Sequence, residues 1–477
     1  MSLQRKTILG TFWNVSRTFV VSIVDFTVYA VLARFLSLEE FALLAFSLLV
    51  VEFATMLTNV GVNQNLIQRE KWEQSYFKSV LTIILLLSAC VTLVLASAGG
   101  VLSYFFYSAE ASLIIVALAI LPMLMALQSI YSAKLERDFL NKEITIVRTL
   151  TSIVFGILTI VLVFNSFGIW SIVISKLIQH FVTLLIFMWR SNLPIKLGAN
   201  SHHLQEIKNF CLPLFGIALV NFFHNKGSNL FVGAVLGAEK FALISVSKKG
   251  YDVLGQLTIT SVNRMIVPSL SRVKPDNRVD RLYDIVRFSS LLITPCYLGL
   301  GAVSEEFITI AFGEKYVASA IYLTITTAAI SGSIMAWYLP NLLISSGHTS
   351  AAFRLKIIGF VRTLGVTAVT VWFGVEVMLV SLTITTYLLL PVSFTIVSQF
   401  FPISFRRMLD ASIPAIVSSG IMLASLYASK FLLLEELDVW ARLLALILIG
   451  ALSYMLSIVV FFRKSLFYVL SALKSIR

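Results

Sequence analysis

The sequence predicts an all-α polytopic membrane protein with about fourteen transmembrane helices, built as two six-helix lobes plus two extra C-terminal helices. Of its 477 residues, 58% are hydrophobic and 13% are charged, whereas soluble domains carry about 25% charged residues. The apolar residues form continuous runs of the length that a membrane-spanning helix needs, about 20 residues. The runs lack the alternation of barrel strands, so we expect helices. An internal parallel repeat indicates the two lobes.

The apolar runs define fourteen predicted spans. Their approximate limits are 8–34, 41–66, 79–107, 111–133, 145–164, 168–189, 210–236, 241–268, 285–304, 320–345, 353–373, 375–400, 411–431 and 439–462. The first span is too long for a signal-peptide core and has no small-residue cleavage site, so we expect a retained anchor. Residues 304–319 predict a short interfacial segment, and residues 463–477 predict an amphipathic helix on the cytoplasmic surface.

The basic residues lie mainly on one set of connections between the spans. That set includes Arg137, Arg148, Arg354, Lys356 and Arg362, whereas the opposite side carries Arg34, Lys240, Lys315, Lys430 and Arg442. By the positive-inside rule, this asymmetry predicts that both termini are cytoplasmic. It also assigns most of the formal net charge of +13 to membrane topology. Nucleic-acid binding is excluded, because the basic residues do not line one soluble face.

One segment of the chain occurs twice. Residues 39–67 align without a gap on residues 239–267, with nine identical positions among 29, and acidic Glu52 falls on acidic Asp252. Both copies start from the same side of the membrane, so the repeat is parallel. The predicted domains are 1–205 (helices 1–6), 206–402 (helices 7–12) and 403–477 (helices 13–14 and the tail). Transporters built from such repeats bind substrate near the midplane and rock one half against the other.

Polar and charged side chains inside the predicted spans gather on spans 1, 2, 7 and 8. Charges at this depth are costly and usually face a water-filled cavity or a partner. The basic candidates for binding an anionic head group are Lys248, Lys249, Lys226, Arg17 and His224. The acidic candidates for binding a coupling cation are Asp25, Glu52 and Asp252.

Two other interpretations of these residues stay open. The charges can pair with one another across helices and hold the lobes together, and Lys248 can extend to the membrane interface. His224 either titrates near neutral pH and carries protons or is a hydrogen-bonded residue of the bundle. The adjacent pair Lys248-Lys249 is the first choice for a phosphate site, because too few acidic residues lie near it in the sequence to neutralise both.

Motifs for catalysis and for cofactor binding are absent from the sequence. We find no metal-ligand spacing, no glycine-rich phosphate loop with its lysine, and no large outer loop that would house a glycosyl-transfer site. Each of the three cysteines, Cys90, Cys211 and Cys296, falls in or beside an apolar span and is expected to be a small buried residue. We therefore expect a transporter with no cofactor rather than an enzyme.

Four segments resemble a known family. They are 33–46 (ARFLSLEEFALLAF), 228–247 (SNLFVGAVLGAEKFALISVS), 263–272 (NRMIVPSLSR) and 342–356 (LLISSGHTSAAFRLK). With them the chain resembles the polysaccharide-transport (O-antigen and exopolysaccharide flippase) branch of the multidrug/oligosaccharidyl-lipid/polysaccharide flippase superfamily, over nearly its whole length. Ser228 stands where many relatives carry an acidic residue, so an ion-coupling role is not transferred to it.

The resemblance implies a function. Members of that family move lipid-linked oligosaccharides, usually built on undecaprenyl pyrophosphate, across the bacterial inner membrane. The sugar head group passes through a cationic central cavity while the lipid stays in the bilayer. We therefore predict a flippase working by alternating access in O-antigen, capsule or exopolysaccharide assembly. The implied partners are the lipid-linked oligosaccharide, the bilayer, a coupling H⁺ or Na⁺, and the glycan polymerase and chain-length machinery.

Two alternatives remain beside this prediction. A multidrug cation antiporter shares the superfamily architecture, but such a pump should have an acidic, aromatic cavity, whereas the embedded charges here lean basic. A membrane glycan polymerase or ligase belongs to another functional class, and the missing large outer loop argues against it.

Overall fold

The computed structural model describes residues 3–59, 61–106, 109–258, 277–432 and 437–463, with side chains from residue 18 onward except 98–111. Regular structure in these ranges is entirely helical, and thirteen stretches within them are long and apolar enough to cross a membrane. One of these, α9 (Ser201–Leu257), is broken at Gly237, whose φ of 83° and ψ of −178° are not helical. Because α9 therefore contains two of the predicted spans, the fourteen-helix prediction is confirmed.

The chain divides into two compact units, Met1–Lys226 and Gly227–Arg477, which we call unit 1 and unit 2. The division falls within α9. The predicted lobe boundaries at residues 205/206 and 402/403 stay predictions.

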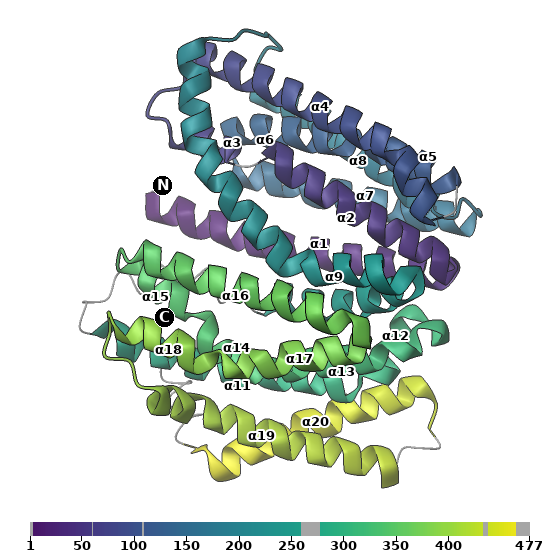
Figure 1. Cartoon of the computed structure of the whole chain (residues 1–477), viewed down its shortest axis with the longest axis vertical. Helices are drawn as coiled ribbons and strands as arrows, with labels where there is room; N and C mark the ends of the chain where they lie inside the picture. The colour runs from purple at the N-terminus through teal and green to yellow at the C-terminus, as the bar shows by residue number, and fades with distance from the viewer. Residues whose placement is uncertain (1–2, 60, 107–108, 259–276, 433–436, 464–477) are drawn as a thin grey trace. The chain divides into compact units, whose positions relative to one another are not determined.

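Unit 1 is a bundle of eight helices and the first part of α9. The eight are α1 (Leu3–Phe35), α2 (Leu38–Asn59), α3 (Val62–Gln68), α4 (Gln74–Phe106), α5 (Ala109–Leu118), α6 (Leu121–Arg137), α7 (Asn141–Phe164) and α8 (Trp170–Ser191). α8 packs against α6 and α7, and α1 lies along α7 (Figure 1). A Cβ at Gly156 of α7 would lie 2.6 Å from Val24 of α1, so glycine permits this close approach. The core includes Tyr76, Tyr131 and Phe187, all fully buried.

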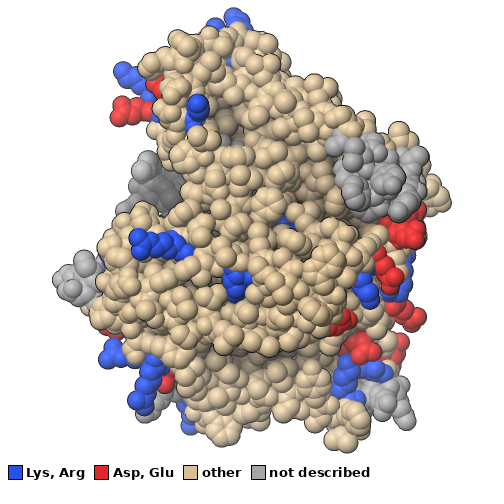
Figure 2. All heavy atoms as spheres, in the orientation of Figure 1, with Lys and Arg blue, Asp and Glu red and all other residues tan. Residues whose placement is uncertain are grey.

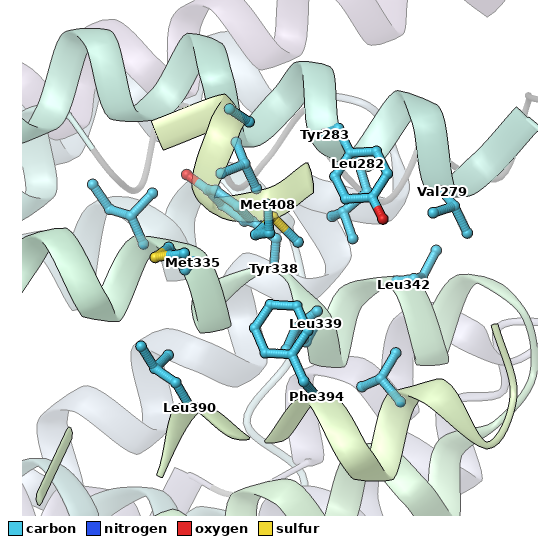
Figure 3. Packing of buried hydrophobic residues seen from close by; sticks show 14 of the residues in the cluster. Val279, Leu282, Tyr283, Met335, Tyr338, Leu339, Leu342, Leu390, Phe394 and Met408 are labelled. Carbon is cyan, nitrogen blue, oxygen red and sulfur yellow. The ribbon is translucent and has the colours of Figure 1, made fainter. Parts of the chain in front are cut away.

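Unit 2 contains the rest of α9 and the elements that follow it. These are α11 (Arg278–Ala302), α12 (Ser304–Phe312), η2 (Glu314–Ser319), α13 (Ala320–Ala328), α14 (Ile330–Trp337), α15 (Leu339–Ser345), α16 (Thr349–Thr370), η3 (Val371–Phe373), α17 (Val375–Leu388), α18 (Leu390–Ser398), α19 (Phe405–Leu432) and α20 (Val439–Phe461). α11 packs against α13 and α19, and α19 packs against α20. Figure 3 shows the core of this unit, where Leu282, Tyr338 and Leu339 meet Phe394 and Met408.

The two units repeat the same neighbour relations among their helices. In unit 1, α4 contacts α5 and α6, α6 contacts α8, and α8 contacts α7; in unit 2, α11 contacts α13 and α14, α13 contacts α17, and α17 contacts α16. The tetrapeptide Val147-Arg148-Thr149-Leu150 of α7 also recurs as Val361-Arg362-Thr363-Leu364 of α16. The repeat found at spans 2 and 8 therefore extends to spans 5 and 11.

Prolines and glycines stand at several helix ends. Pro122, Pro340 and Pro391 stand in the first turns of α6, α15 and α18, where a missing N–H and a fixed φ are tolerated. Gly237 has the positive φ that only glycine adopts without strain. A Cβ at Gly233 would lie 3.1 Å from the Phe241 ring, so the two arms of α9 approach closely there. Pro268 and the predicted tail helix from residue 464 onward lie outside the described residues.

The surface of unit 2 fits a membrane environment. In Figure 2 the face over α16, α17 and α19 is almost entirely tan, apart from isolated basic atoms, and charged groups gather at its ends. Trp372, in η3 directly after α16, is 70% exposed, and Trp440, at the start of α20, is 60% exposed. Exposed tryptophans at helix ends are typical of the membrane–water interface.

Candidate functional site

The predicted site residues fall in both units. Unit 1 holds Asp25 on α1, Glu52 on α2, and His224 and Lys226 on the first arm of α9, while the Arg17 side chain lies outside the described residues. Unit 2 holds Lys248, Lys249 and Asp252 on the second arm of α9. Asp25 is exposed, and His224, Lys249 and Asp252 are half-buried.

Glu52 and Lys226 form an ion pair within unit 1. The Lys226 Nζ lies 3.2 Å from the Glu52 Oε2, with side chains 27% and 52% exposed. The neighbouring Phe53 packs against Phe222 at 5.0 Å and Phe223 at 5.9 Å between ring centroids. Phe222, Phe223 and Lys226 share one face of α9 because residues three and four apart are neighbours on a helix. The sequence left open whether the charges inside the spans pair across helices, and Glu52 and Lys226 do so.

Lys248 contacts the other arm of α9. Its Nζ donates to the Asn229 Oδ1 at 3.5 Å. These residues are 19 positions apart, and the reversal at Gly237 brings them together. The amide oxygen is a neutral acceptor, so this contact orients the ammonium group without neutralising it.

Ser228 has a hydroxyl partner. Its Oγ lies 2.9 Å from the Thr367 Oγ1 of α16, and Thr367 is fully buried. A neutral hydroxyl pair thus joins α9 to α16 at the position where many members of the resembled family have an acidic residue.

Arg362 is a functional candidate that the sequence interpretation missed. We assigned it to the cytoplasmic connections, and this assignment is wrong because Arg362 is the fourteenth residue of the stretch Thr349–Phe373. Its Nη1 donates to the Thr386 hydroxyl of α17, and its Nη2 donates to the Thr363 hydroxyl at 3.2 Å. The sequence itself indicated this position, because residue 362 lies inside the predicted span 353–373.

A second missed cluster joins α12 to α19. The Lys430 Nζ lies 2.8 Å from the Glu306 Oε1 and 3.5 Å from the Glu305 Oε2. The Glu306 side chain is 3% exposed, and Lys430 is the cation that pairs with this buried carboxylate. Sequence reasoning treated Lys430 only as an outer-loop charge, because its partners are more than a hundred residues away. This cluster stabilises the fold and is not part of the candidate site.

A polar network closes one end of unit 1. Arg69 donates to the Glu206 Oε2 at 2.9 Å and lies 3.5 Å from the centroid of the Tyr76 ring. Burial lowers the pKa of Arg69, but its hydrogen bonds to Glu206 and Tyr76 outweigh burial and leave the pKa raised. Arg137 donates to the carbonyl oxygens of Leu66 and Glu70. This network is structural, since it ties α9 and α6 to the segment between α3 and α4.

The described side chains offer no cluster of three or more His, Cys, Asp or Glu that would hold a metal ion. Besides scattered carboxylates and His224, the polar groups inside the spans are lysines, arginines, hydroxyls and amides. Such groups bind and orient an anion or a sugar, since ammonium and guanidinium donate hydrogen bonds and hydroxyls both donate and accept.

Comparison with protein families identifies the relatives of this chain. The family described as "Polysaccharide biosynthesis protein" matches residues 31–321, more than half of the chain. The chain belongs to this family. It is 22% identical over 475 residues to the teichuronic acid biosynthesis protein TuaB of Bacillus subtilis (strain 168), covering 96% of each chain. It is 23% identical to the lipopolysaccharide biosynthesis protein WzxC of Escherichia coli (strain K12), covering 75% of this chain and 73% of that one.

A third relative matches over a shorter stretch. The succinoglycan biosynthesis transport protein ExoT of Rhizobium meliloti (strain 1021) is 21% identical over 294 residues. The match covers 61% of this chain and spans 59% of the length of ExoT.

Solved structures show the same fold. The lipid II flippase MurJ in its inward closed conformation superposes with a TM-score of 0.77 at 15% identity, covering 96% of this chain and 99% of MurJ. An inward-facing multidrug resistance MATE family transporter gives a TM-score of 0.52 at 12% identity, covering 85% of this chain and 96% of the transporter. The chain is thus a multi-pass membrane protein with the fold of the multidrug/oligosaccharidyl-lipid/polysaccharide superfamily. Its family is one of transporters rather than enzymes, and the predicted resemblance is confirmed.

Proposed function

We propose that this protein is a flippase that moves an oligosaccharide linked to undecaprenyl pyrophosphate across the bacterial inner membrane. The observation that carries the proposal is membership of the polysaccharide biosynthesis family combined with a fold match to a lipid II flippase over 96% of the chain. The relatives serve succinoglycan transport and the biosynthesis of teichuronic acid and lipopolysaccharide. O-antigen, capsule or exopolysaccharide assembly is the corresponding process, and both termini are cytoplasmic.

In this proposal the cations of the helical spans bind the anionic part of the substrate. Lys248, Lys249, Lys226, Arg17 and His224 attract the pyrophosphate or an acidic sugar. Lys248 is oriented for this by Asn229, whose amide leaves the positive charge in place. A lysine ammonium has three donors, so a phosphate oxygen can add to this contact.

The acidic residues have the second role. Asp25, Glu52 and Asp252 bind a coupling H⁺ or Na⁺, and alternating access carries the head group between the two sides. Glu52 is already paired with Lys226. An anionic substrate competes with Glu52 for Lys226, and this competition provides a physical link between substrate binding and release of the carboxylate. The lobes 1–205 and 206–402 are the proposed moving halves.

The test is complementation of a bacterial strain that lacks its own flippase for a defined glycan. Expression of this chain should restore surface glycan and clear lipid-linked oligosaccharide from the cytoplasmic leaflet. Continued accumulation of that intermediate, with the protein present in the membrane, would contradict the proposal. Resistance to cationic drugs without restored glycan would favour the multidrug antiporter, and a change in glycan chain length alone would favour a polymerase.

A further inference from the structure

Arg362 stands in the middle of a membrane span and has no role in the function proposed above. It is fourteenth in a stretch of 25 residues, Thr349–Phe373. With a rise of 1.5 Å per residue, it lies about 20 Å from one end and about 16 Å from the other. A charge at this depth is expensive, and its default interpretation is a functional site.

The surroundings of Arg362 are polar but neutral. Its two hydrogen bonds go to the hydroxyl groups of Thr386 and Thr363. Among the described residues, no carboxylate oxygen lies within the 4.0 Å of an ion pair with Arg362. Its Nε is buried and has no hydrogen-bond partner there. The guanidinium is therefore neither neutralised nor fully hydrogen-bonded in this conformation.

These observations define the kind of ligand that would complete the site. A guanidinium presents five N–H donors in a planar fork that matches the oxygens of a phosphate or a carboxylate. We propose that Arg362 binds an oxyanion of the transported molecule, either a phosphoryl group of the lipid carrier or the carboxylate of an acidic sugar. This inference rests on the proposed function and adds a binding residue on α16.

The unsatisfied Nε has a consequence for transport. Because a buried donor without a partner is destabilising, a conformation in which an oxyanion reaches the guanidinium gains stability relative to the present one. The ligand thus favours that conformation through its differential affinity. Hydrogen bonds to the threonines keep the guanidinium oriented until the oxyanion arrives.

The competing explanation is that Arg362 only links α16 to α17 through Thr386. Arg362→Gln removes the positive charge, and Arg362→Lys keeps the charge but lacks the planar guanidinium donors. Thr386→Val removes the hydrogen bond between α16 and α17 and leaves the guanidinium in place. Arg354→Gln is the matched control, because Arg354 is exposed and lies two turns earlier on the same helix. In the complementation assay we expect Arg362→Gln to lower export about ten-fold or more, Arg362→Lys to lower it less, and the other two variants to stay within about two-fold of wild type. Wild-type export by Arg362→Gln, or an equal loss in Thr386→Val, would overturn the inference.

Ligand-dependent stability gives an independent readout. Thermal unfolding of the purified full chain is measured with inorganic pyrophosphate or with glucuronate at constant ionic strength. We expect one of these probes to raise the Tm of wild type and Arg354→Gln but not of Arg362→Gln, and the effective probe tells the phosphoryl from the carboxylate source. Without ligand, Arg362→Gln should be as stable as wild type or more so, because it removes an uncompensated charge. A lower Tm with an unchanged ligand shift would show a structural role. If phosphatidylglycerol vesicles raise the Tm of wild type but not of Arg362→Gln, and neither pyrophosphate nor glucuronate does so, the site binds a bilayer lipid. That result would overturn the inference.

Failure of this inference is distinguishable from failure of the proposed function. If wild type restores glycan and Arg362→Gln does so equally, the role of Arg362 is wrong and the flippase function stands. If wild type restores no glycan at normal protein levels, the proposed function is wrong.

Discussion

The two copies of the Val-Arg-Thr-Leu tetrapeptide have the same sequence and different surroundings. On α7 of unit 1, Arg148 is the eighth residue of its helix, and its guanidinium lies 5.6 Å from the centroid of the Phe187 ring. On α16 of unit 2, Arg362 lies at mid-span and donates to two threonine hydroxyls. The repeat has thus kept the arginine and the helix while changing what the guanidinium contacts.

The second pair of equivalent positions shows the same divergence. In unit 1, Glu52 pairs with Lys226. In unit 2, Asp252 takes the place of Glu52, but Lys248 and Lys249 stand where unit 1 has Leu48 and Leu49. The two units share neighbour relations among their helices and differ in the polar groups that those helices carry. The adjacent lysines of the second arm of α9 therefore have no basic counterpart on α2.

The largest expected effect comes from the double variant Lys248→Ala, Lys249→Ala. Because hydrogen bonds to charged groups contribute roughly 1.5–3 kcal/mol each, loss of both cations should lower glycan export about a hundred-fold. Export is measured as surface glycan at equal protein levels in the membrane, with Lys240→Ala at the exposed turn as the control. Normal surface glycan in the double variant would show that the anion site lies elsewhere.

Replacing the two equivalent arginines tests the first comparison directly. We expect Arg362→Gln to reduce export about ten-fold and Arg148→Gln about two-fold, since contact of a cation with an aromatic ring contributes only about 0.5–1 kcal/mol at exposed sites. The same complementation assay measures both variants. Equal losses would mean that the arginines act alike and that the different surroundings have no functional meaning.

Lys430→Met tests the ion pair between Lys430 and Glu306 in unit 2. The change leaves the Glu306 carboxylate buried and without its cation, which should cost about 3 kcal/mol. The measurement is thermal unfolding in detergent. Its control is Glu305→Gln, at a side chain that is 62% exposed, where a loss below about 1 kcal/mol is expected. An unchanged Tm in Lys430→Met would show that another group holds Glu306.

Glu52→Gln and Asp252→Asn compare the acidic positions of the two units. If both carboxylates serve coupling, each variant should weaken the dependence of export on the proton or sodium gradient by a few-fold. Export is followed while each gradient is dissipated in turn. An effect confined to Glu52→Gln would leave the ion pair with Lys226 as the coupling element and exclude Asp252.

The smallest expected effect is that of Gly237→Ala. No neighbouring atom lies within 4 Å of a Cβ at Gly237, so only the positive φ of 83° opposes the change. Because ψ is −178°, the conformation is one that residues other than glycine almost never adopt, and its strain costs about 1 kcal/mol or slightly more. Thermal unfolding measures this cost. A loss several times larger would mean that the break in α9 has to move. The control is Gly365→Ala, at an exposed helical position that also has open space.

The fold class and the number of helices follow from the amino-acid sequence alone. Long apolar runs specify spans because a helix in lipid must satisfy its own backbone and needs a fixed length to cross. The ungapped match of residues 39–67 to 239–267 likewise indicated the duplication. Gly237 was also predictable as a turn, since two apolar spans meet there without room for a longer loop.

Which polar groups meet could be learned from the folded chain but not from the sequence. Glu52 and Lys226 lie on different helices and far apart in the chain, and so do Lys430 and Glu306, so no local pattern could pair them. Arg362 was assigned to a loop because counting positive charges near span ends does not reveal depth or neighbours. Side-chain partners depend on how helices pack against one another, and that packing follows from contacts distant in sequence.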